Sequence, residues 1–256
     1  MKLEQVALTL YTLREFCKTP EDLAQTLKKV RKIGYPAVQI SGVGPIPEEE
    51  IVKMLDGEGL VCCATHEKSQ IILENPEAVV ERLNKLNCKY TAFPNPDKAD
   101  IENIDTVKAL AAKLNASGKV IFEGGKVLTY HNHYGEFKRA DNTTFMDIIY
   151  SHTDSRYLQG EIDTYWVQYG GGDVVKWVKK MNGRLPLLHI KDYVINENKE
   201  ITYTEIGNGN LEWKDIIAAA DASGCEWFIV EQDRCPGDPF DSIKQSFDYI
   251  KGNLLQ

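Results

Sequence analysis

"VLTYHNHYGEF", residues 127–137, is an apolar run that ends in two histidines separated by one residue, with a carboxylate shortly after them. Side chains of a β-strand alternate between its two faces, so His131 and His133 are expected to point to the same side. Two such imidazoles can be metal ligands, acid–base groups, or simply polar residues where a strand reaches water. It is the fifth of eight short apolar runs, each followed by a segment with helical spacing, and the eight runs together predict the fold.

The eight short apolar runs are candidate strands, and they cover residues 6–10, 37–40, 60–65, 90–93, 126–131, 157–163, 185–190 and 227–232. Each is followed by a segment whose apolar residues recur at helical spacing, such as Leu23, Leu27 and Val30. The segments "TPED" (19–22) and "NPEA" (75–78) place proline and then acids where helices are expected to begin. With no linker in the chain, this alternation predicts an α/β fold with one domain, residues 1–256, forming a (β/α)8 TIM barrel. A doubly wound open sheet is the main alternative.

The composition of the chain argues against nucleic acid and membranes as partners. The chain has 256 residues, 43% of them hydrophobic, and a net charge of -8, so a phosphate backbone would be repelled on average. We therefore expect no nucleic-acid partner. No long apolar segment or signal peptide is evident, so no membrane partner is expected. None of the six cysteines forms a CxxC pair, which favours reduced thiols and a cytoplasmic location.

Polar residues stand where the predicted strands end. In TIM barrels the active groups lie at the carboxyl ends of the strands. A single histidine or carboxylate at such a place is ordinarily a hydrogen-bonded structural residue or a helix cap. Here, however, four successive strands end in His131, Asp163, His189 and Glu231. Imidazoles combined with carboxylates suit Mn²⁺, Zn²⁺, Co²⁺ or Fe²⁺, whereas oxygen ligands alone would have suggested Mg²⁺. The pattern favours a divalent metal site.

Several motifs also resemble a known family. They are, in order, "YHNHYGEF", "EIDTYWV", "PLLHIKD", "EIGNGNLEW" and "FIVEQD", and the similarity runs from "LTLYTLRE" to the last helix. Together they resemble the sugar phosphate isomerase/epimerase family of the xylose isomerase-like TIM barrels, in its "YHNH…EF" branch. These motifs are specific for the superfamily and only weakly specific for a substrate. The resemblance implies one divalent metal ion (Mn, Zn, Co, Fe or Mg) and a keto sugar or polyol as substrate.

The resemblance also implies a set of metal ligands. Family members typically hold the ion with a Glu, an Asp, a His and a Glu on strands five to eight. The last three correspond to Asp163, His189 and Glu231. Strand five departs from the pattern, because it ends in "YHNH" without a Glu. His131 is closest to the missing ligand's place, but His133 shares its face, so either can be the fourth ligand.

The other residues at the mouth are assigned to catalysis and substrate binding. Glu231 is the expected base, and Glu136 stands where the related ketose epimerases carry a second acid–base carboxylate, unless it forms a loop salt bridge instead. Lys191 is expected to stabilise an enolate oxygen, and His66 to shuttle a proton or bind a hydroxyl; a surface lysine and a structural histidine are the alternatives. The expected substrate-binding residues are Trp166, Arg14, His133 and Glu161.

These assignments predict a metal-dependent isomerase or epimerase, or a lyase, that removes a proton next to a carbonyl. An inosose dehydratase or an enzyme acting on 3-keto-glycosides falls within this class. One alternative is a non-catalytic sugar-binding barrel. Another is an endonuclease-four-like phosphodiesterase, but such enzymes gather three metals and the chain is net acidic. The expected partner is a small-molecule sugar, and a homo-oligomer is left open.

Overall fold

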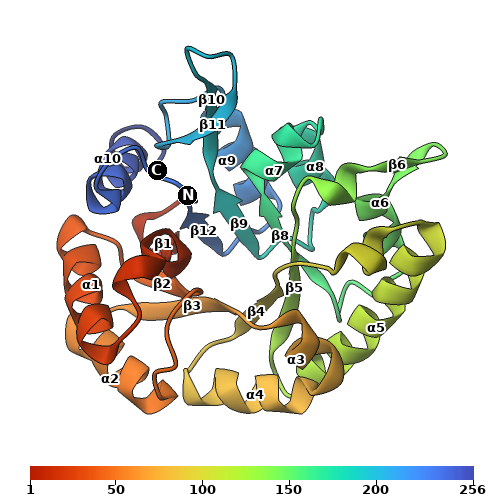
Figure 1. Cartoon of the computed structure of the whole chain (residues 1–256), viewed down its shortest axis with the longest axis horizontal. Helices are drawn as coiled ribbons and strands as arrows, with labels where there is room; N and C mark the ends of the chain where they lie inside the picture. Colours follow the sequence, from red (N-terminus) through yellow and green to blue (C-terminus); the bar gives the residue numbers. More distant parts are fainter.

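The computed structural model describes residues 1–256 and contains a closed barrel of parallel strands (Figure 1). Around the barrel the strand order is β1-β12-β9-β8-β5-β4-β3-β2, so the last strand of the chain pairs with the first. The eight strands are β1 (Val6–Thr9), β2 (Ala37–Ile40), β3 (Val61–His66), β4 (Tyr90–Phe93), β5 (Val127–His131), β8 (Gln159–Asp163), β9 (Leu187–Ile190) and β12 (Trp227–Val230). The predicted TIM barrel is confirmed, and the open sheet is excluded.

Helices surround the barrel on its outside (Figure 1). They are α1 (Pro20–Ile33), α2 (Glu48–Glu58), α3 (Ser69–Glu74), α4 (Pro76–Lys85), α5 (Ile104–Glu123), α6 (Phe145–Ser151), α7 (Thr164–Tyr169), α8 (Val174–Lys180), α9 (Trp213–Ala222) and α10 (Pro239–Asn253). Both α1 and α4 begin at the prolines that mark their starts in the sequence, with Thr19 and Asn75 as N-caps. No helix has the length and apolar character that crossing a membrane requires.

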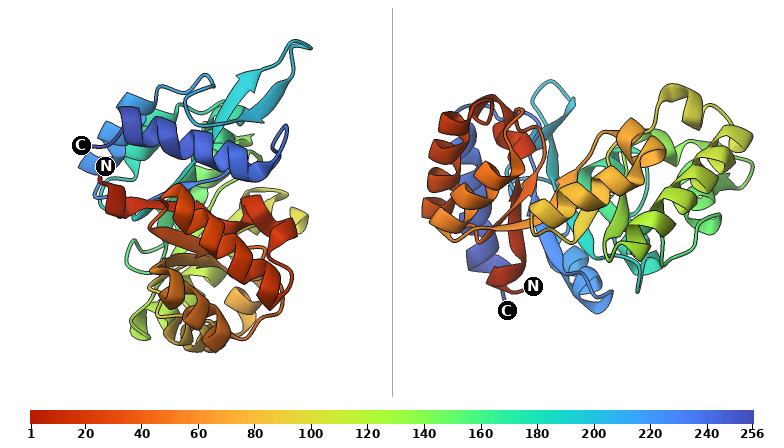
Figure 2. Two further views of the ribbon diagram at one scale, coloured as in Figure 1. Left: turned by 90° about the vertical axis from the view of Figure 1, so that its left-hand side faces the viewer. Right: turned by 90° about the horizontal axis from the view of Figure 1, so that it is seen from below.

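Two small antiparallel ribbons lie outside the barrel and were not predicted. The first joins β10 (Asp192–Ile195) to β11 (Ile201–Thr204) and projects away from the barrel (Figure 2). The second joins the two-residue strands β6 (Arg139–Ala140) and β7 (Thr143–Thr144). The other regular elements are four short 3-10 helices: η1 (Leu3–Gln5), η2 (Leu10–Phe16), η3 (Lys98–Ile101) and η4 (Gly135–Phe137). The longer ribbon brings Tyr203 to the barrel mouth.

The core has two parts, because each strand buries both of its faces. A large cluster packs the outer faces of the strands against the helices. A smaller cluster fills the barrel interior and consists of Ala7, Ala37, Cys63, Ala64, Tyr90, Leu187 and Ile229. Two positions further along their strands, the inward side chains change from Leu187 to His189 and from Ile229 to Glu231. The apolar interior thus supports a polar layer at the carboxyl ends of the strands.

Candidate active site

Strand pairing places the polar side chains side by side. His131 on β5 is in register with Glu161 on β8, and Asp163 on β8 is in register with His189 on β9. All four are buried, with at most 3% of their surface exposed. Asn132, between the two histidines of "HNH", accepts a hydrogen bond from the backbone N–H of Asp163 at 3.0 Å. This contact ties the end of β5 to that of β8 and explains why a polar residue separates the histidines.

Glu161 lies at the centre of three imidazoles. Its Oε1 is 2.5 Å from Nε2 of His66, 3.1 Å from Nδ1 of His131 and 3.1 Å from Nε2 of His189. Its Oε2 accepts a hydrogen bond from Nε2 of Gln39 at 2.8 Å. Burial alone would raise the pKa of Glu161, but the neighbouring His189 and His66 and the contact with His131 hold this pKa well below its ordinary value. Glu161 is therefore a buried carboxylate ion.

His189 connects Glu161 to a second acidic group. Its Nδ1 lies 2.9 Å from Oε2 of Glu231, and its Nε2 lies 3.0 Å from Oε1 of Gln39. Burial would lower the pKa of His189, but Glu161 and Glu231 on its two sides raise this pKa to about 10. In the absence of a metal ion, the His189 ring is thus an imidazolium between two carboxylates.

The second acidic group surrounds Lys191, which is 1% exposed. Its Nζ lies 2.6 Å from Oδ2 of Asp233, 3.2 Å from Oε2 of Glu231 and 3.5 Å from Oδ2 of Asp163. Burial opposes the charge of Lys191, but the three carboxylates raise its pKa, so the side chain is an ammonium ion. Burial raises the pKa of Asp163 to about 7; Lys191 opposes this rise and Glu231 adds to it. The Asp163 carboxyl can therefore be protonated near neutral pH.

Two overlapping groups of side chains have the geometry to hold a metal ion. One is His131, Asp163, His189 and Glu231, and the other is His66, His131, Glu161 and His189; within each, the ligand atoms lie within 4.8 Å of one another. The first group is the ligand set predicted from the sequence. Two of its buried atoms, Nδ1 of His131 and Oδ2 of Asp163, have no hydrogen-bond partner. Burial lowers the pKa of His131 well below its ordinary value, so the ring is neutral and can donate a lone pair. These residues therefore fit a divalent ion.

A polar cavity of about 600 Å³ opens above the cluster. Its walls include His66, His131, His133, Trp166, Lys191, Tyr203, Glu231 and Asp233. The ammonium of Lys191 lies 5.0 Å from the ring centre of Trp166 and 5.4 Å from that of Tyr203. Arg14 also lines the cavity and donates hydrogen bonds to the backbone oxygens of Tyr11 and Asp233. The cavity thus offers one aromatic wall and several charged groups to a ligand.

The structure brings most of the predicted residues together but leaves Glu136 outside the cavity. Its Oε1 accepts a hydrogen bond from the hydroxyl of Tyr130 at 2.9 Å, and its Oε2 accepts one from the backbone N–H of His133 at 3.2 Å. Burial raises the pKa of this 1% exposed carboxyl, although the hydrogen bond from Tyr130 opposes the rise. This geometry positions the loop after β5. Glu161 also differs from its expected place, because it lies beneath the cavity rather than on its wall.

Three residues of the site were not assigned a role from the sequence. Tyr203 reaches the cavity from the unpredicted β10–β11 ribbon, and no motif marked it. Asp233 makes the shortest contact to Lys191. Gln39 on the second strand forms hydrogen bonds with both Glu161 and His189. Inward alternation along β2 and β12 could have identified Gln39 and Asp233.

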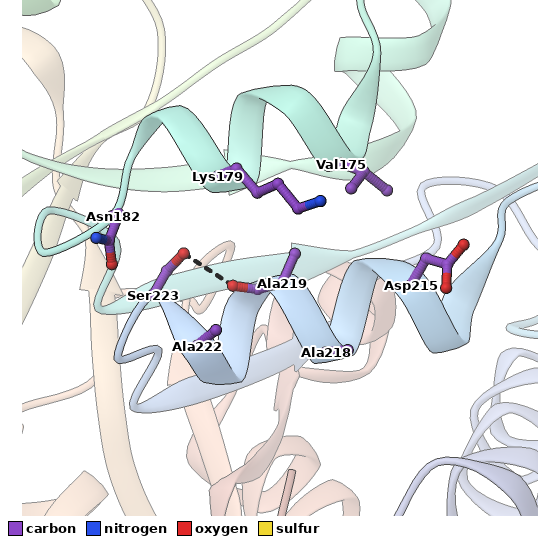
Figure 3. Close-up of a pocket in the computed structure, with 8 residues that line it drawn as sticks. All are labelled: Val175, Lys179, Asn182, Asp215, Ala218, Ala219, Ala222 and Ser223. Atoms are coloured by element: carbon purple, nitrogen blue, oxygen red, sulfur yellow. Dashed lines mark hydrogen bonds between the residues drawn. The ribbon is translucent and has the colours of Figure 1, made fainter.

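A second hollow of similar size, about 580 Å³, lies on the outside of the barrel between α8 and α9 (Figure 3). Its lining includes Val175, Lys179, Ala218, Ala219 and Ala222, and Ser223 donates a hydrogen bond to the backbone oxygen of Ala219. It contains no histidine and no cluster of carboxylates. This hollow therefore offers no cluster of candidate catalytic groups.

Comparison with known proteins identifies the family of the barrel. Residues 27–252 match the model of the xylose isomerase-like TIM barrel family. The chain belongs to this family. An inosose dehydratase of Geobacillus thermodenitrificans, for example, is 26% identical over 172 residues, which cover 60% of this chain and 57% of that protein. The match therefore spans little more than half the length of that relative.

Two solved structures align over a larger share of the chain. A sugar phosphate isomerase/epimerase from Parabacteroides distasonis is 25% identical, with a TM-score of 0.84, covering 97% of this chain and 98% of that one. A second protein of the same description and organism has a TM-score of 0.85 at 23% identity, covering 99% and 96% of the two chains. This second similarity supports the fold alone.

Proposed function

We propose that the protein is a divalent-metal-dependent isomerase or epimerase, or a lyase, that removes a proton next to the carbonyl of a keto sugar or polyol. The observation that carries the proposal is the meeting of His131, Asp163, His189 and Glu231 under a polar cavity. In this group Nδ1 of His131 and Oδ2 of Asp163 are buried and make no hydrogen bond. Similarity to an inosose dehydratase and to a sugar phosphate isomerase/epimerase supports the class of substrate.

In this proposal the ion is held by His131, Asp163, His189 and Glu231, with His133 as the alternative ligand on the fifth strand. A bound divalent ion would act as a Lewis acid toward the substrate carbonyl and its adjacent hydroxyl. Gln39 keeps the ring of His189 oriented by accepting a hydrogen bond from its Nε2, as partners of ligating histidines commonly do. The ring then presents Nδ1 toward Glu231.

Proton transfer is assigned to residues that border the cavity. Burial would raise the pKa of Glu231, but Lys191 and His189 hold it well below its ordinary value, so this carboxylate is ionised. We assign it as the base because it borders the cavity beside the proposed ion. His66, whose Nδ1 lies 3.2 Å from Oγ of Ser41, lines the same cavity and is the group proposed to return the proton. For a lyase, the same return of a proton would assist loss of a hydroxyl or glycoside. Glu136 is assigned a positioning role.

The remaining side chains bind the substrate. The ammonium of Lys191 is a hydrogen-bond donor only, and it can donate to a substrate oxygen on which negative charge develops. Trp166 offers an aromatic face on which the apolar side of a sugar ring can stack, and Arg14 and His133 offer hydrogen-bond donors at the cavity edge. None of these roles requires a phosphate on the substrate.

A screen for solvent proton exchange tests the proposal directly. Keto sugars, inososes and 3-keto-glycosides would be incubated with the protein and Mn²⁺ in D₂O, and deuterium in each compound followed by NMR. Deuterium at the carbon next to the carbonyl in one class is the expected result. Tight binding of a sugar without exchange, turnover or elimination in any compound would favour a non-catalytic sugar-binding barrel instead.

A further inference from the structure

Asp192 is a buried carboxylate to which the proposed function assigns no role. It is 0% exposed and directly follows Lys191 in the sequence. Successive side chains of an extended chain point to opposite sides. Lys191 accordingly lines the mouth cavity, whereas Asp192 does not.

Five N–H groups donate hydrogen bonds to the carboxylate of Asp192. They are Nε1 of Trp213 (2.7 Å) and the backbone N–H groups of Gly207 (3.0 Å), Gly209 (3.2 Å), Leu211 (3.4 Å) and Tyr193 (2.9 Å). Burial raises the pKa of Asp192, and the hydrogen bonds from Trp213 and Gly207 oppose the rise. All of the donors except Tyr193 lie in residues 207–213, so this carboxylate fixes the path of that segment.

The glycines of the motif "EIGNGNLEW" (205–213) allow the segment to wrap around the carboxylate. A Cβ at Gly209 would lie 2.2 Å from Oδ1 of Asp192 and 2.3 Å from the backbone oxygen of Tyr193. Gly207 has a φ of +91°, which side chains disfavour. The two glycines of "GNGN" therefore serve the contact with Asp192.

The contacts of Asp192 close the base of the β10–β11 ribbon. Asp192 is the first residue of β10 and is in register with Thr204, the last residue of β11. The segment 205–213, which bonds Asp192, directly follows β11 in the chain. At the other end of the ribbon, Ile195 and Ile201 are paired with each other and exposed. The direction of the ribbon is therefore set at its base.

The ribbon brings Tyr203 to the cavity, one residue before the base. The ring centre of Tyr203 lies 5.4 Å from Nζ of Lys191. The same ring stacks on Tyr165, with 4.6 Å between the ring centres and an angle of 27° between the planes. Its centre lies 6.2 Å from that of Trp166. A shift at the base of the ribbon would move Tyr203 relative to these groups.

The neighbouring Lys191 is held by different contacts. Its backbone N–H donates to Oγ1 of Thr164 at 3.0 Å, and its backbone oxygen accepts a hydrogen bond from the same hydroxyl at 2.9 Å. Its ammonium is paired with the carboxylates in the mouth. Loss of the Asp192 carboxylate should therefore displace Tyr203 more than Lys191.

We propose that Asp192 is a positioning residue that acts through the ribbon: it fixes the base and so sets where Tyr203 lies on the cavity wall, and Tyr203 determines how tightly the keto sugar binds. The inference rests on the proposed function for its substrate, whereas the anchor itself rests on the hydrogen bonds of Asp192. Asparagine has the same size, but its NH₂ group would face N–H donors instead of accepting from them. Asp192→Asn therefore tests the anchor.

The first measurement is amide hydrogen exchange in the full-length protein, followed by mass spectrometry, and it requires no substrate. Asp192→Asn should exchange faster than wild type in residues 192–213, with the barrel strands unchanged. Trp213→Phe removes only the bond from Nε1 and should show a smaller increase. Asp173→Asn is the matched control, because Asp173 is an exposed cap of α8 and does not line the mouth cavity. Equal exchange of residues 192–213 in wild type and Asp192→Asn would overturn the anchor.

The second measurement separates KM from kcat on the keto sugar that the D₂O screen identifies. Asp192→Asn should raise KM about tenfold, with a smaller change in kcat. In a Tyr203→Ala background the same substitution should raise KM no further, because the side chain that Asp192 positions is absent. Multiplied effects in the double variant would overturn the action through Tyr203. A fall in kcat with unchanged KM would also overturn it, and would indicate an action through Lys191.

The two measurements distinguish failure of this inference from failure of the proposed function. An active wild type that Asp192→Asn matches in both exchange and KM would overturn this inference alone. A wild type that turns over none of the sugars would overturn the proposed function and the role of Tyr203 in binding, whereas faster exchange in Asp192→Asn would still support the anchor. Circular dichroism shows whether each variant is folded. If Asp192→Asn is unfolded, the milder Trp213→Phe takes its place in both measurements.

Discussion

Lys191 and Asp233 form the shortest lysine–carboxylate contact in the barrel mouth, with Nζ 2.6 Å from Oδ2. The same ammonium lies 3.2 Å from Oε2 of Glu231 and 3.5 Å from Oδ2 of Asp163. Asp233 can therefore hold Lys191 in place when the other two carboxylates bind a metal ion. The arrangement positions a permanent positive charge beside the proposed metal site, where it can face the substrate.

Replacing this ammonium is expected to reduce turnover without removing metal. Lys191→Met preserves the length and much of the volume of the side chain but cannot stabilise a developing oxyanion. Removing one such donor typically costs about 10²–10³-fold in kcat. Steady-state kinetics and metal content per chain would be measured together, with Lys176→Met, an exposed lysine on α8, as the control. Loss of metal in Lys191→Met would mean that Lys191 organises the ligands instead.

The sequence and the structure assign different roles to Glu136, and a substitution can distinguish them. As an acid–base group it should contribute about 10²–10⁴-fold to the rate. In the structure both of its oxygens are occupied, by the hydroxyl of Tyr130 and the backbone N–H of His133. We therefore expect Glu136→Gln, which can still accept a hydrogen bond from Tyr130, to lower kcat less than about tenfold. A fall of a thousandfold with unchanged stability would restore the catalytic role.

The stability of the metal-free protein should fall as the pH rises from neutral to alkaline values. The pKa of His189 is raised in the folded protein from 6.5 to about 10, mainly by Glu161 and Glu231 acting against burial. A raised pKa contributes stability that is fully present below pH 6.5 and is lost as the pH passes through about 10. The loss should be on the order of a few kcal/mol. Urea denaturation of chelator-treated protein between pH 6 and 10 would measure it.

Two comparisons make this pH test specific. His189→Gln cannot carry the charge, so its unfolding free energy should vary less with pH over the same range. Bound Mn²⁺ would replace the proton on Nδ1 of His189, so the metal-loaded protein should also show a flatter profile. If the metal-free wild type showed no alkaline loss, the imidazolium between the two carboxylates would be ruled out.

Much of the fold could be predicted because its signals are local. Apolar runs and helical stripes identified all eight barrel strands, and the structure moves their ends by only a few residues, as when the predicted run 227–232 ends at Val230. The β10–β11 ribbon was missed because its exposed residues, such as Ile195 and Ile201, have no buried face to create a clear pattern. Its stability comes from pairing across a turn, and its position above the mouth is a tertiary property.

The sequence predicted which residue types form the candidate site, but not which of these side chains contact one another. Inward alternation placed His131, Asp163, His189 and Glu231 at the strand ends, and barrel closure brought them together. Glu161 was expected on the cavity wall, and no local pattern shows that it meets His66, which is 95 residues away, or Gln39, which is 122 residues away. These contacts depend on strand register and on the curvature of the barrel, which sequence periodicity does not specify.

The proposed chemical step requires a carbon–hydrogen bond to break, and this can be followed in D₂O. If a carboxylate takes the proton next to the carbonyl, that proton can exchange with solvent before it is returned. Deuterium should then appear on the adjacent carbon in the product or in recovered substrate. Glu231→Gln keeps the size of the side chain but removes the base, so exchange should fall by at least about 10²–10⁴-fold. Glu226→Gln is the matched control, because Glu226 is exposed and pairs with Lys89 on the surface.

Other outcomes of the exchange experiment identify other mechanisms. Turnover without deuterium in the product would indicate hydride transfer between carbons, or a proton fully shielded from solvent, and a substrate deuterated at the transferred position would separate the two. Full activity in Glu231→Gln would exclude this residue as the base. Asp163, whose pKa is raised to about 7 chiefly by burial, would then be the next carboxylate to replace, because a base with a pKa near the working pH is the most effective one.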